Sequence, residues 1–522
     1  MNKTTYFTLF LSIFLLYACS NSSTEIDTLI KGGTIVDGTG NTSYTGDIGL
    51  KGNEIVFVGN ADNSDIKAKQ TIEAKGMVVS PGFIDPHTHS LSDLQGDSNN
   101  SNLNYLTQGV TTVMNGNDGG GPTDIAAKEQ LLLKNGIGTN TAFLVGHNTI
   151  REAVLESKDV APDSLQLEEM KALVRKGMKT GAFGFSTGLY YVPGFYAETE
   201  EVIALAKEAA PFGGLYESHI RDESTYNIGL IESVKETIEI GEKAGVPIHF
   251  AHIKALGVDV WGKSGEVIAL IEAAQKRGIK ITADQYPWIA SGTHLENALI
   301  NRWVMEGGEE KYQERLNDPK LLPKIRIEII ENLRKRGGAN SILITADCKD
   351  ESMIGFNLKE ISEKLQRDSI QLVLDIARNG GARIASFNMN PKDLENFMQQ
   401  DWVMTSSDGT KGHPRKFGTF PKKFQDYVML KKLLTMESYI RKCTGQVAAT
   451  FGIVKRGLLQ KGYYADVVVF SPKNFKSIAN FSQPSELSEG VQYLWVNGEL
   501  TIEGGKYTGK LAGQVLKKNT IE

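Results

Sequence analysis

Apolar, strand-like runs alternate with amphipathic, helix-like segments through the middle of this chain, and no other feature constrains its fold as strongly. The helix-like stretches at residues 200–213, 231–245 and 265–278 each end on glycine, the usual C-terminal cap of a helix. Strands that alternate with helices favour βα units and a parallel sheet. The strand candidates are residues 77–85, 109–116, 141–147, 181–189, 214–220, 246–253, 279–285, 382–389 and 401–408.

This pattern predicts an α/β protein built on a closed, TIM-like (β/α)8 barrel over residues 77–459. Such a barrel needs eight strands, so at least one of the nine candidates must be false or an extra strand. Residues 287–358 break the alternation with segments that contain Trp, Glu and Lys. We interpret them as an insertion over the mouth of the barrel.

The two ends of the chain share a different sequence pattern, in which short strand-like runs are separated by turns that contain glycine. It is found in residues 26–76 and again in residues 460–516. Neither part looks self-sufficient. We therefore expect both termini to pair into one small β domain beside the barrel.

The N-terminus has the features of an export signal. Lys3 precedes an apolar run, residues 7–18, that is short for a membrane span. The run ends in Leu-Tyr-Ala-Cys, which resembles the bacterial lipobox. We expect residues 1–19 to be a lipoprotein signal peptide with Cys19 as the lipidation site, and residues 20–25 to be a tether. A plain secretory signal is the alternative, and either interpretation predicts the bacterial cell envelope, lipid-anchored or periplasmic.

The composition of the chain limits the classes of molecule that it is expected to bind. The chain has 522 residues and a formal net charge of −5, with no long basic run, which argues against a nucleic-acid partner and favours a small molecule. Cys348 and Cys443 could form one disulfide or remain two free thiols.

Four of the eight histidines follow strand candidates. His87 and His89 form a His-x-His pair, and period-2 alternation points both toward one place, where they can bind one ion. His219 and His252 close two later strands, and Asp408 closes the last. Side chains that do chemistry in parallel barrels lie at such strand ends. The five residues together predict a metal site, although a lone His-x-His would not.

The order His-x-His, His, His, Asp resembles the amidohydrolase superfamily, and more closely the D-aminoacylases, or N-acyl-D-amino-acid deacylases. The resemblance extends from residue 81 to about residue 471. It implies a distorted barrel with a small β domain from both termini and an insertion, and metal-dependent hydrolysis of N-acyl-D-amino acids. The segments that carry it are PGFIDPHTHS, QGVTTVMNGND, FGFSTGLYYVPG, AETEEVIALA, ESHIRDE, HFAHIK, DQYPW, SSDGTKGHPRKFGTFP and ATFGIVKRGLLQKGYYADVVVFSP.

One departure from the family concerns the metal. Family members usually carry a metal-binding cysteine in a Gly-Asn-Cys-Gly segment, and here Asp118 stands in the place of that cysteine. A carboxylate can bridge two ions about 3.5–4 Å apart, although Asp-Gly is also ordinary turn chemistry. We expect zinc as the divalent metal, with manganese, cobalt or iron more competitive because the thiolate is missing.

The resemblance also implies residue roles. His219, His252 and Asp118 would hold the hydrated metal, with His87 and His89 completing a second site. Asp408 would be the general base. Arg415 would bind the substrate carboxylate, and Lys254, Tyr286 and Tyr191 would help to hold the substrate. Of the remaining polar residues, Arg221 could brace the site, His249 would pack behind it, His147 could line the mouth, and His294 and Arg302 could contact a polar or acidic substrate side chain.

Three other functions remain open. Cyclic-amide hydrolases such as dihydroorotases and hydantoinases typically use a lysine on the fourth strand to bridge the metals, and residues 181–189 contain none. A dipeptidase for D residues could use the same machinery. A non-catalytic binding lipoprotein would be expected to lose part of the metal site, and here only the cysteine is replaced.

Overall fold

The structure, a computed structural model, describes residues 24–518. The predicted signal peptide and the lipidation site at Cys19 lie outside these residues. The last two residues of the predicted tether, Thr24 and Glu25, already belong to β1 (Thr24–Ile35). None of the helices among the described residues is long and apolar enough to cross a membrane. Cys348 and Cys443 are buried free thiols, so they form no disulfide.

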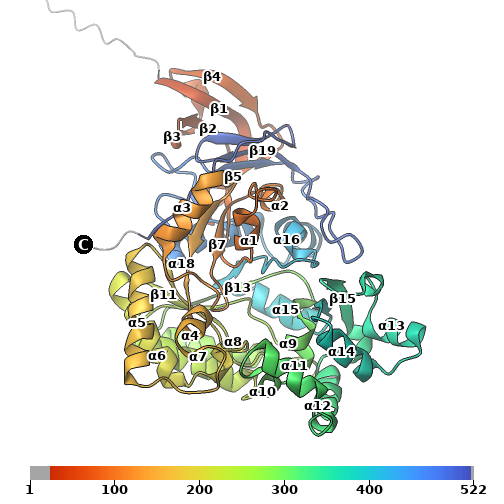
Figure 1. Cartoon of the computed structure of the whole chain (residues 1–522). Helices are drawn as coiled ribbons and strands as arrows, with labels where there is room; N and C mark the ends of the chain where they lie inside the picture. Colours follow the sequence, from red (N-terminus) through yellow and green to blue (C-terminus); the bar gives the residue numbers. More distant parts are fainter. Residues whose placement is uncertain (1–23, 519–522) are drawn as a thin grey trace, which may run out of the picture.

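Eight parallel strand positions form the predicted barrel (Figure 1). Two hydrogen-bonded sheets, β6-β7-β8 and β9-β10-β11-β12-β13-β17, make up its wall. Backbone bonds join their edges, from Asp408 N to His87 O (2.9 Å) and from Leu144 N to Asn115 O (3.0 Å). The strands are β6 (Phe83–Asp85), β7 (Val110–Asn115), β8 (Asn140–Phe143) continued by β9 (Val145–Gly146), β10 (Gly184–Gly188), β11 (Leu215–His219), β12 (Ile248–Phe250), β13 (Ile281–Gln285) and β17 (Val403–Thr405).

Amphipathic helices cover the outside of this wall. In α7 the apolar Val234 and Ile240 are buried toward the strands, and Gly245 ends the helix in the left-handed conformation (φ 71°). The covering helices, α7 included, are α1 (Leu91–Gln95), α2 (Leu103–Leu106), α3 (Ile125–Asn135), α4 (His147–Leu155), α5 (Ser164–Lys179), α6 (Thr199–Ala206), α7 (Leu230–Ala244), α8 (Ser264–Lys276), α15 (Pro391–Met398), α16 (Arg415–Lys423), α17 (Met436–Cys443) and α18 (Gly445–Phe451).

One of the nine strand candidates, residues 382–389, is not a barrel strand but an extra strand, as the count of nine allowed. Its central part, β16 (Arg383–Ser386), pairs antiparallel with β14 (Ser291–His294) and β15 (Ile342–Ala346) in a sheet of the insertion. A short apolar run does not show whether it will pair in the sheet of the barrel or in that of the insertion, because the periodicity of the sequence is the same in both sheets.

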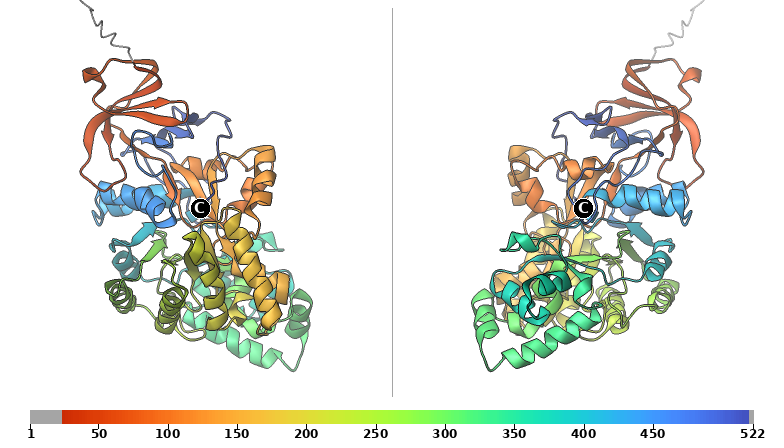
Figure 2. Two further views of the ribbon diagram at one scale, coloured as in Figure 1. Left: turned by 90° about the vertical axis from the view of Figure 1, so that its left-hand side faces the viewer. Right: turned by 90° about the vertical axis from the view of Figure 1, so that its right-hand side faces the viewer.

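The insertion is larger than expected from the sequence. It has its own apolar core, whose buried members run from Leu295 to Ile384, beyond residue 358. It lies on one flank of the barrel mouth (Figures 1 and 2). Its helices are α9 (Leu295–Leu299), α10 (Arg302–Met305), α11 (Glu309–Asn317), α12 (Leu322–Lys335), α13 (Leu358–Leu365) and α14 (Ser369–Arg378).

Both termini contribute to one nine-stranded sheet at the far end of the barrel (Figure 1). The antiparallel pairing of β5 with β18 joins the two parts of the chain. The strands run in the order β21-β20-β19-β18-β5-β1-β2-β3, with β4 on β1. Their bounds are β2 (Tyr44–Lys51), β3 (Glu54–Gly59), β4 (Ile66–Glu73), β5 (Val78–Pro81), β18 (Val467–Phe470), β19 (Val491–Val496), β20 (Glu499–Glu503) and β21 (Lys506–Tyr507).

The apolar run at residues 77–85 is divided between the two domains. Its first half is β5 in the terminal sheet and its second half is β6 in the barrel, so the border lies inside the run rather than at residue 77. Gly82 stands between the halves, and a Cβ there would lie 2.3 Å from the Thr111 side chain. Only glycine permits this close crossing of the two sheets.

Candidate metal centre and substrate cavity

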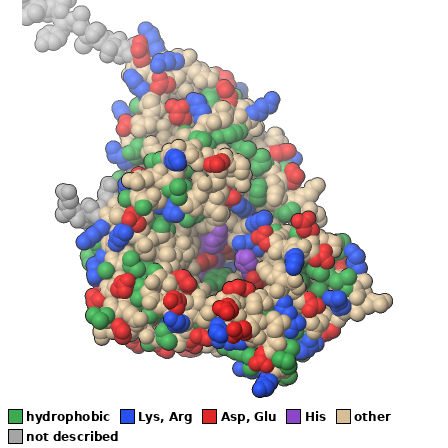
Figure 3. Space-filling model, in the orientation of Figure 1, with side chains coloured by type: hydrophobic (Ala, Val, Ile, Leu, Met, Phe, Trp, Pro, Cys, Tyr) green, Lys and Arg blue, Asp and Glu red, His purple; other side chains and the backbone are tan. Residues whose placement is uncertain are grey.

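The predicted metal ligands all lie at the carboxyl edge of the barrel strands. Figure 3 shows histidines in a hollow between the barrel and the insertion. His219 is the last residue of β11, and Asp408 follows β17 by three residues. Because parallel strands end at the same edge, residues far apart in the chain meet there.

Asp118 is shared by two groups of possible ligands. One group is His87, His89, Asp118 and Asp408, and the other is Asp118, His219 and His252; within each group the ligand atoms lie within 4.8 Å of one another. Oδ1 of Asp118 is 3.5 Å from His87 Nε2, 3.4 Å from His252 Nε2 and 3.7 Å from His219 Nδ1. Its Oδ2 is 3.5 Å from His89 Nε2. Asp118 is therefore placed to bridge two cations.

The donor atoms fit a divalent cation. Both ring nitrogens of His87 and Oδ1 of Asp118 are buried without a hydrogen-bond partner among the described residues. Buried polar atoms are costly unless they are satisfied, and a cation bound there would satisfy Oδ1 of Asp118 and Nε2 of His87, while Nδ1 of His87 faces Glu217 at 3.4 Å. Imidazole and carboxylate are ligands for zinc and also for harder transition metals.

The backbone is strained at three of these residues. Asp118, His252 and Asp408 adopt positive φ angles of 55°, 35° and 45°. Residues other than glycine enter this region at a cost of about 1–3 kcal/mol each, and they do so mainly at functional sites. The turn chemistry expected at Asp118 is thus present, and the same turn aims its carboxylate at the histidines.

Arg415 controls the charge of Asp408. Burial raises the pKa of the Asp408 carboxyl, but the guanidinium of Arg415, with Nη1 2.8 Å from Oδ2, and the nearby imidazoles lower that pKa well below its usual range. On the other side, Oδ1 of Asp408 lies 3.2 Å from His89 Nε2. Asp408 therefore stays ionised and can accept a proton.

Two buried carboxylates behind the ligands were not assigned from the sequence. Glu217 Oε1 is 3.4 Å from His87 Nδ1, and Asp284 Oδ2 is 3.8 Å from the same nitrogen. Asp284 also bonds His249 Nε2 at 2.8 Å, which holds His249 behind the site as predicted. Glu217 precedes His219 by two residues, so period-2 alternation could have revealed it.

The structure brings together three of the four residues predicted to bind substrate. The Tyr286 ring lies 5.7 Å from Lys254 Nζ and 4.6 Å from the Arg415 guanidinium. Lys254 Nζ donates to Glu223 Oε1 (2.7 Å) and lies 2.6 Å from His252 Nδ1, so Glu223 is a further site residue that sequence reasoning missed. The ring of Tyr191 lies 4.7 Å from that of His219.

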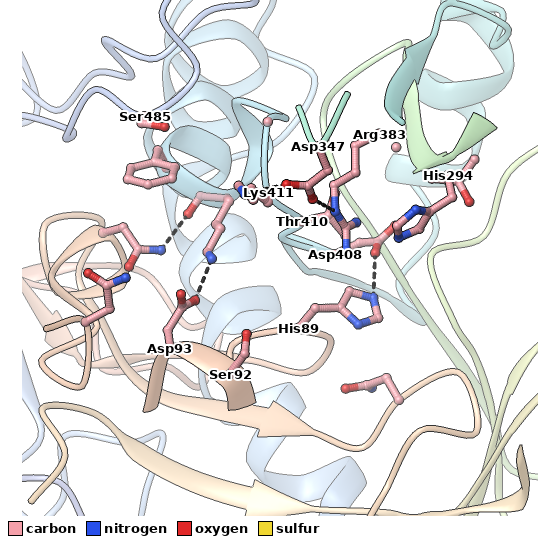
Figure 4. A pocket seen from close by; sticks show the side chains of 18 of the residues that line it. His89, Ser92, Asp93, His294, Asp347, Arg383, Asp408, Thr410, Lys411 and Ser485 are labelled. Atoms are coloured by element: carbon pink, nitrogen blue, oxygen red, sulfur yellow. Dashed lines mark hydrogen bonds and ion pairs between the residues drawn. The ribbon is translucent and has the colours of Figure 1, made fainter. Parts of the chain in front are cut away.

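Two cavities adjoin this cluster. The outer one has a volume of about 780 Å³, and Asp118 is among the residues that line it. Figure 4 shows His89 and Asp408 on its barrel side and His294, Asp347, Arg383 and Lys411 opposite. The inner one has a volume of about 30 Å³ and is lined by residues that include His219, His252, Lys254 and Tyr286. Tyr191 and Asp408 line both cavities, so the two join beside the candidate metal site.

The remaining predicted residues divide into two kinds. His294 lines the outer cavity as expected, and Arg221 braces the region through a bidentate pair with Glu236. Arg302 is different, because its guanidinium donates to the backbone carbonyls of Tyr190, Ile300 and Asn297 and lines neither of these two cavities. His147 is bonded to Glu201 at 2.7 Å and lines neither cavity.

Comparison with known proteins places this geometry in a family. The amidohydrolase family model matches residues 326–502. D-aminoacylase from Alcaligenes xylosoxydans xylosoxydans is 31% identical, over 95% of this chain and 99% of that protein. N-acyl-D-aspartate deacylase from the same organism is 29% identical, over 94% and 95%. The crystal structure of N-acyl-D-glutamate deacylase from Bordetella bronchiseptica, complexed with zinc and a phosphonate inhibitor, is 29% identical with a TM-score of 0.81, over 94% of this chain and 100% of that one.

Proposed function

The chain belongs to the D-aminoacylase family of amidohydrolases, and on this premise we propose that it is a metal-dependent hydrolase that cleaves N-acyl-D-amino acids to a carboxylate and a free D-amino acid. The observation that carries the proposal is the meeting of two ligand groups at Asp118, on the wall of a cavity large enough for an acylated amino acid. A cyclic-amide hydrolase is less well supported, because β10 offers no lysine to bridge the metals.

The metal would be held by His219, His252 and Asp118, with His87 and His89 completing the second group on the other side of the shared carboxylate. When bound, a divalent cation supplies a nucleophile at neutral pH and a Lewis acid for the amide carbonyl. Zinc is the cation that we propose, since the crystal structure of the deacylase from Bordetella bronchiseptica contains zinc. The carboxylate of Asp118 in place of a thiolate should make manganese, cobalt or iron more competitive.

The chain's own residues would handle the protons and the substrate charge. Asp408, kept ionised by Arg415, would accept a proton from the attacking water and pass it to the leaving nitrogen. Arg415 and Lys254 would bind the α-carboxylate of the substrate, with Tyr286 between them. The buried hydroxyl of Tyr286 has no hydrogen-bond partner among the described residues and is available for this contact. Tyr191 would line the passage between the cavities.

Metal analysis and parallel assays on two enantiomers test the proposal. We expect one or two divalent ions per chain and amine release from N-acetyl-D-amino acids but not from their L enantiomers. Dipeptides with a C-terminal D residue and dihydroorotate should be assayed beside them. Protein without metal would favour a binding lipoprotein, and equal rates on both enantiomers would contradict the assignment.

We further propose that Cys19 carries a lipid that anchors the protein to a membrane of the bacterial envelope. The support comes from the sequence of residues 1–19 alone. Cell fractionation tests it, since a Cys19→Ala variant should leave the membrane fraction while the wild type stays there. A wild-type protein that is processed without lipid would point to a plain secretory signal.

A further inference from the structure

One buried arginine beside the candidate metal site has no carboxylate partner. Arg336 follows α12 of the insertion, is only 2% exposed and lines the inner cavity together with His219, His252 and Lys254. The two other arginines among the largest fully buried side chains, Arg151 and Arg415, each form a salt bridge. Arg302 is also buried without a carboxylate, but three backbone carbonyls accept from its guanidinium. Only one backbone carbonyl accepts from Arg336, and because a buried charge without compensation is costly, Arg336 calls for a partner.

The groups around Arg336 are all neutral. Its Nε donates to Ala298 O (3.2 Å) and its Nη2 to the hydroxyl of Tyr190 (3.3 Å). The Tyr226 ring lies 5.4 Å from the guanidinium. Turning the Asn388 amide brings its oxygen 3.1 Å from Nη1. These contacts fix the direction of the guanidinium but leave its charge uncompensated.

The other charges of the inner cavity cancel in pairs. Lys254 is bonded to Glu223 at 2.7 Å, and Asp408 is bonded to Arg415 at 2.8 Å. Arg336 is therefore the one charge of this cavity wall, among the described residues, that is left without a counter-charge. The hydroxyl of Tyr226, which lines the same cavity, is also buried without a hydrogen-bond partner among the described residues, whereas that of Tyr286 is assigned to the α-carboxylate.

The size of the cavity limits what can enter. Its volume of about 30 Å³ is room for about two ordered water molecules, since one needs about 10–15 Å³ of such space. This is room for the end of a short polar group and not for a branched or aromatic side chain. A carboxylate is the group that a guanidinium and tyrosine hydroxyls bind best.

We propose that Arg336 binds the side-chain carboxylate of an acidic substrate, so that the preferred substrates are N-acyl derivatives of D-glutamate or D-aspartate. The inference rests on the proposed deacylase function, in which Arg415 and Lys254 take the α-carboxylate, and it assigns the second carboxylate to the inner cavity. The insertion thus supplies the specificity, and the barrel supplies the chemistry.

A pair of substrates of nearly equal shape tests the proposal on the full-length, metal-loaded protein. N-acetyl-D-glutamate and N-acetyl-D-glutamine differ in charge alone, so the ratio of their kcat/KM values reports recognition of the carboxylate. We expect the wild type to favour glutamate and Arg336→Gln to reduce that ratio by about 10- to 100-fold, as for the loss of a hydrogen bond to a charged group.

Two further variants separate binding from folding. Tyr226→Phe keeps the arginine and removes one hydroxyl, so it should lower the ratio by about fivefold and keeps the test usable if Arg336→Gln does not fold. Arg302→Gln is the matched control: a buried insertion arginine bonded to backbone carbonyls, which should lower Tm without changing the ratio.

The outcomes are distinguishable. Equal loss on both substrates in Arg336→Gln would overturn the inference, because Arg336 would then serve the α-carboxylate or the fold. A wild type with no preference for glutamate would overturn it too, while leaving the deacylase function intact. A wild type inactive on every N-acyl-D-amino acid would refute the proposed function itself.

Discussion

The barrel side of the active-site cavity and the insertion side hold their polar residues in different ways. On the barrel side, the side chains of His87 and Asp408 follow hydrogen-bonded strands and are 0% and 8% exposed, and His89 is the exception at 36%. On the insertion side, those of His294 and Asp347 are both 39% exposed. There Lys411 and Arg383 share the one carboxylate of Asp347 (Figure 4). Catalytic geometry must be rigid, whereas a surface that selects substrates can adjust.

Removing the carboxylate of Asp118 should abolish metal binding on the barrel side of the cavity and, with it, activity. Asp118→Ala is expected to lower kcat/KM by at least about 10³-fold, because a metal ion contributes several kcal/mol to the transition state. Metal analysis should show loss from both ligand groups. Asp93→Ala is the matched control in the wall of the same cavity, bonded to Lys416 and outside both groups, and it should keep its metal.

A cysteine at position 118 tests whether the residue at this position determines which metal the protein prefers. Asp118→Cys should move the metal preference toward zinc over manganese, because thiolate is the softer ligand. The preference is measured by letting zinc and manganese compete for the apoprotein and then analysing the bound metal. An unchanged preference in Asp118→Cys, together with unchanged metal content in Asp118→Ala, would mean that residue 118 is only a turn residue.

Neutralising the proposed base tests the chemistry separately from the metal. Asp408→Asn should lower kcat by about 10²- to 10⁴-fold, the usual contribution of a general base, while the group around His219 and His252 keeps its metal. Single-turnover rates and metal content should be measured together. Asp347→Asn, in the opposite wall of the same cavity, should change kcat little. Loss of all metal in Asp408→Asn would make Asp408 a ligand first.

The lysine at the border of the inner cavity should affect binding more than chemistry. Lys254→Met is expected to raise KM by about 10- to 100-fold for every N-acyl-D-amino acid, because the α-carboxylate loses a charged hydrogen bond. Steady-state kinetics on an acidic and a neutral substrate measure it. Lys263→Met, at an exposed ion pair with Glu266, is the control. A loss confined to acidic substrates would show that Lys254 reads the side chain.

A cavity in the core of the insertion should have the smallest effect on the metal site. Ile344 is fully buried in β15, and Ile344→Ala should lower the free energy of unfolding by about 2–5 kcal/mol. Metal content should stay unchanged, because the ligands come from the barrel. Ile330→Ala, at a position 53% exposed on α12, should change stability by less than about 0.5 kcal/mol. Metal loss in Ile344→Ala would show that the two sides fold as one unit.

Residues at the ends of strands can be recognised in the sequence, because an apolar run marks each strand and parallel strands all end at the same edge of the sheet. His87, His89 and His219 follow apolar runs, and parallel strands bring such ends to one edge. Glu217 obeys the same rule and was overlooked. Glu223 and Arg336 obey no such rule: one follows the strand by four residues and the other ends a helix of the insertion, and only packing brings them beside Lys254 and His219.

The sequence by itself predicted the barrel, the pairing of the termini and the candidate site residues His87, His89, His219, His252 and Asp408, because these depend on periodicity and on strand ends. The tertiary structure alone decided that residues 383–386 leave the barrel for the insertion, that Asp118 faces all four histidines, and that Arg302 is bonded to backbone carbonyls while Arg336 is left without a counter-charge. The physical reason is that periodicity gives the direction of a side chain relative to its own strand or helix. The partner that the side chain meets depends on contacts between segments far apart in the chain.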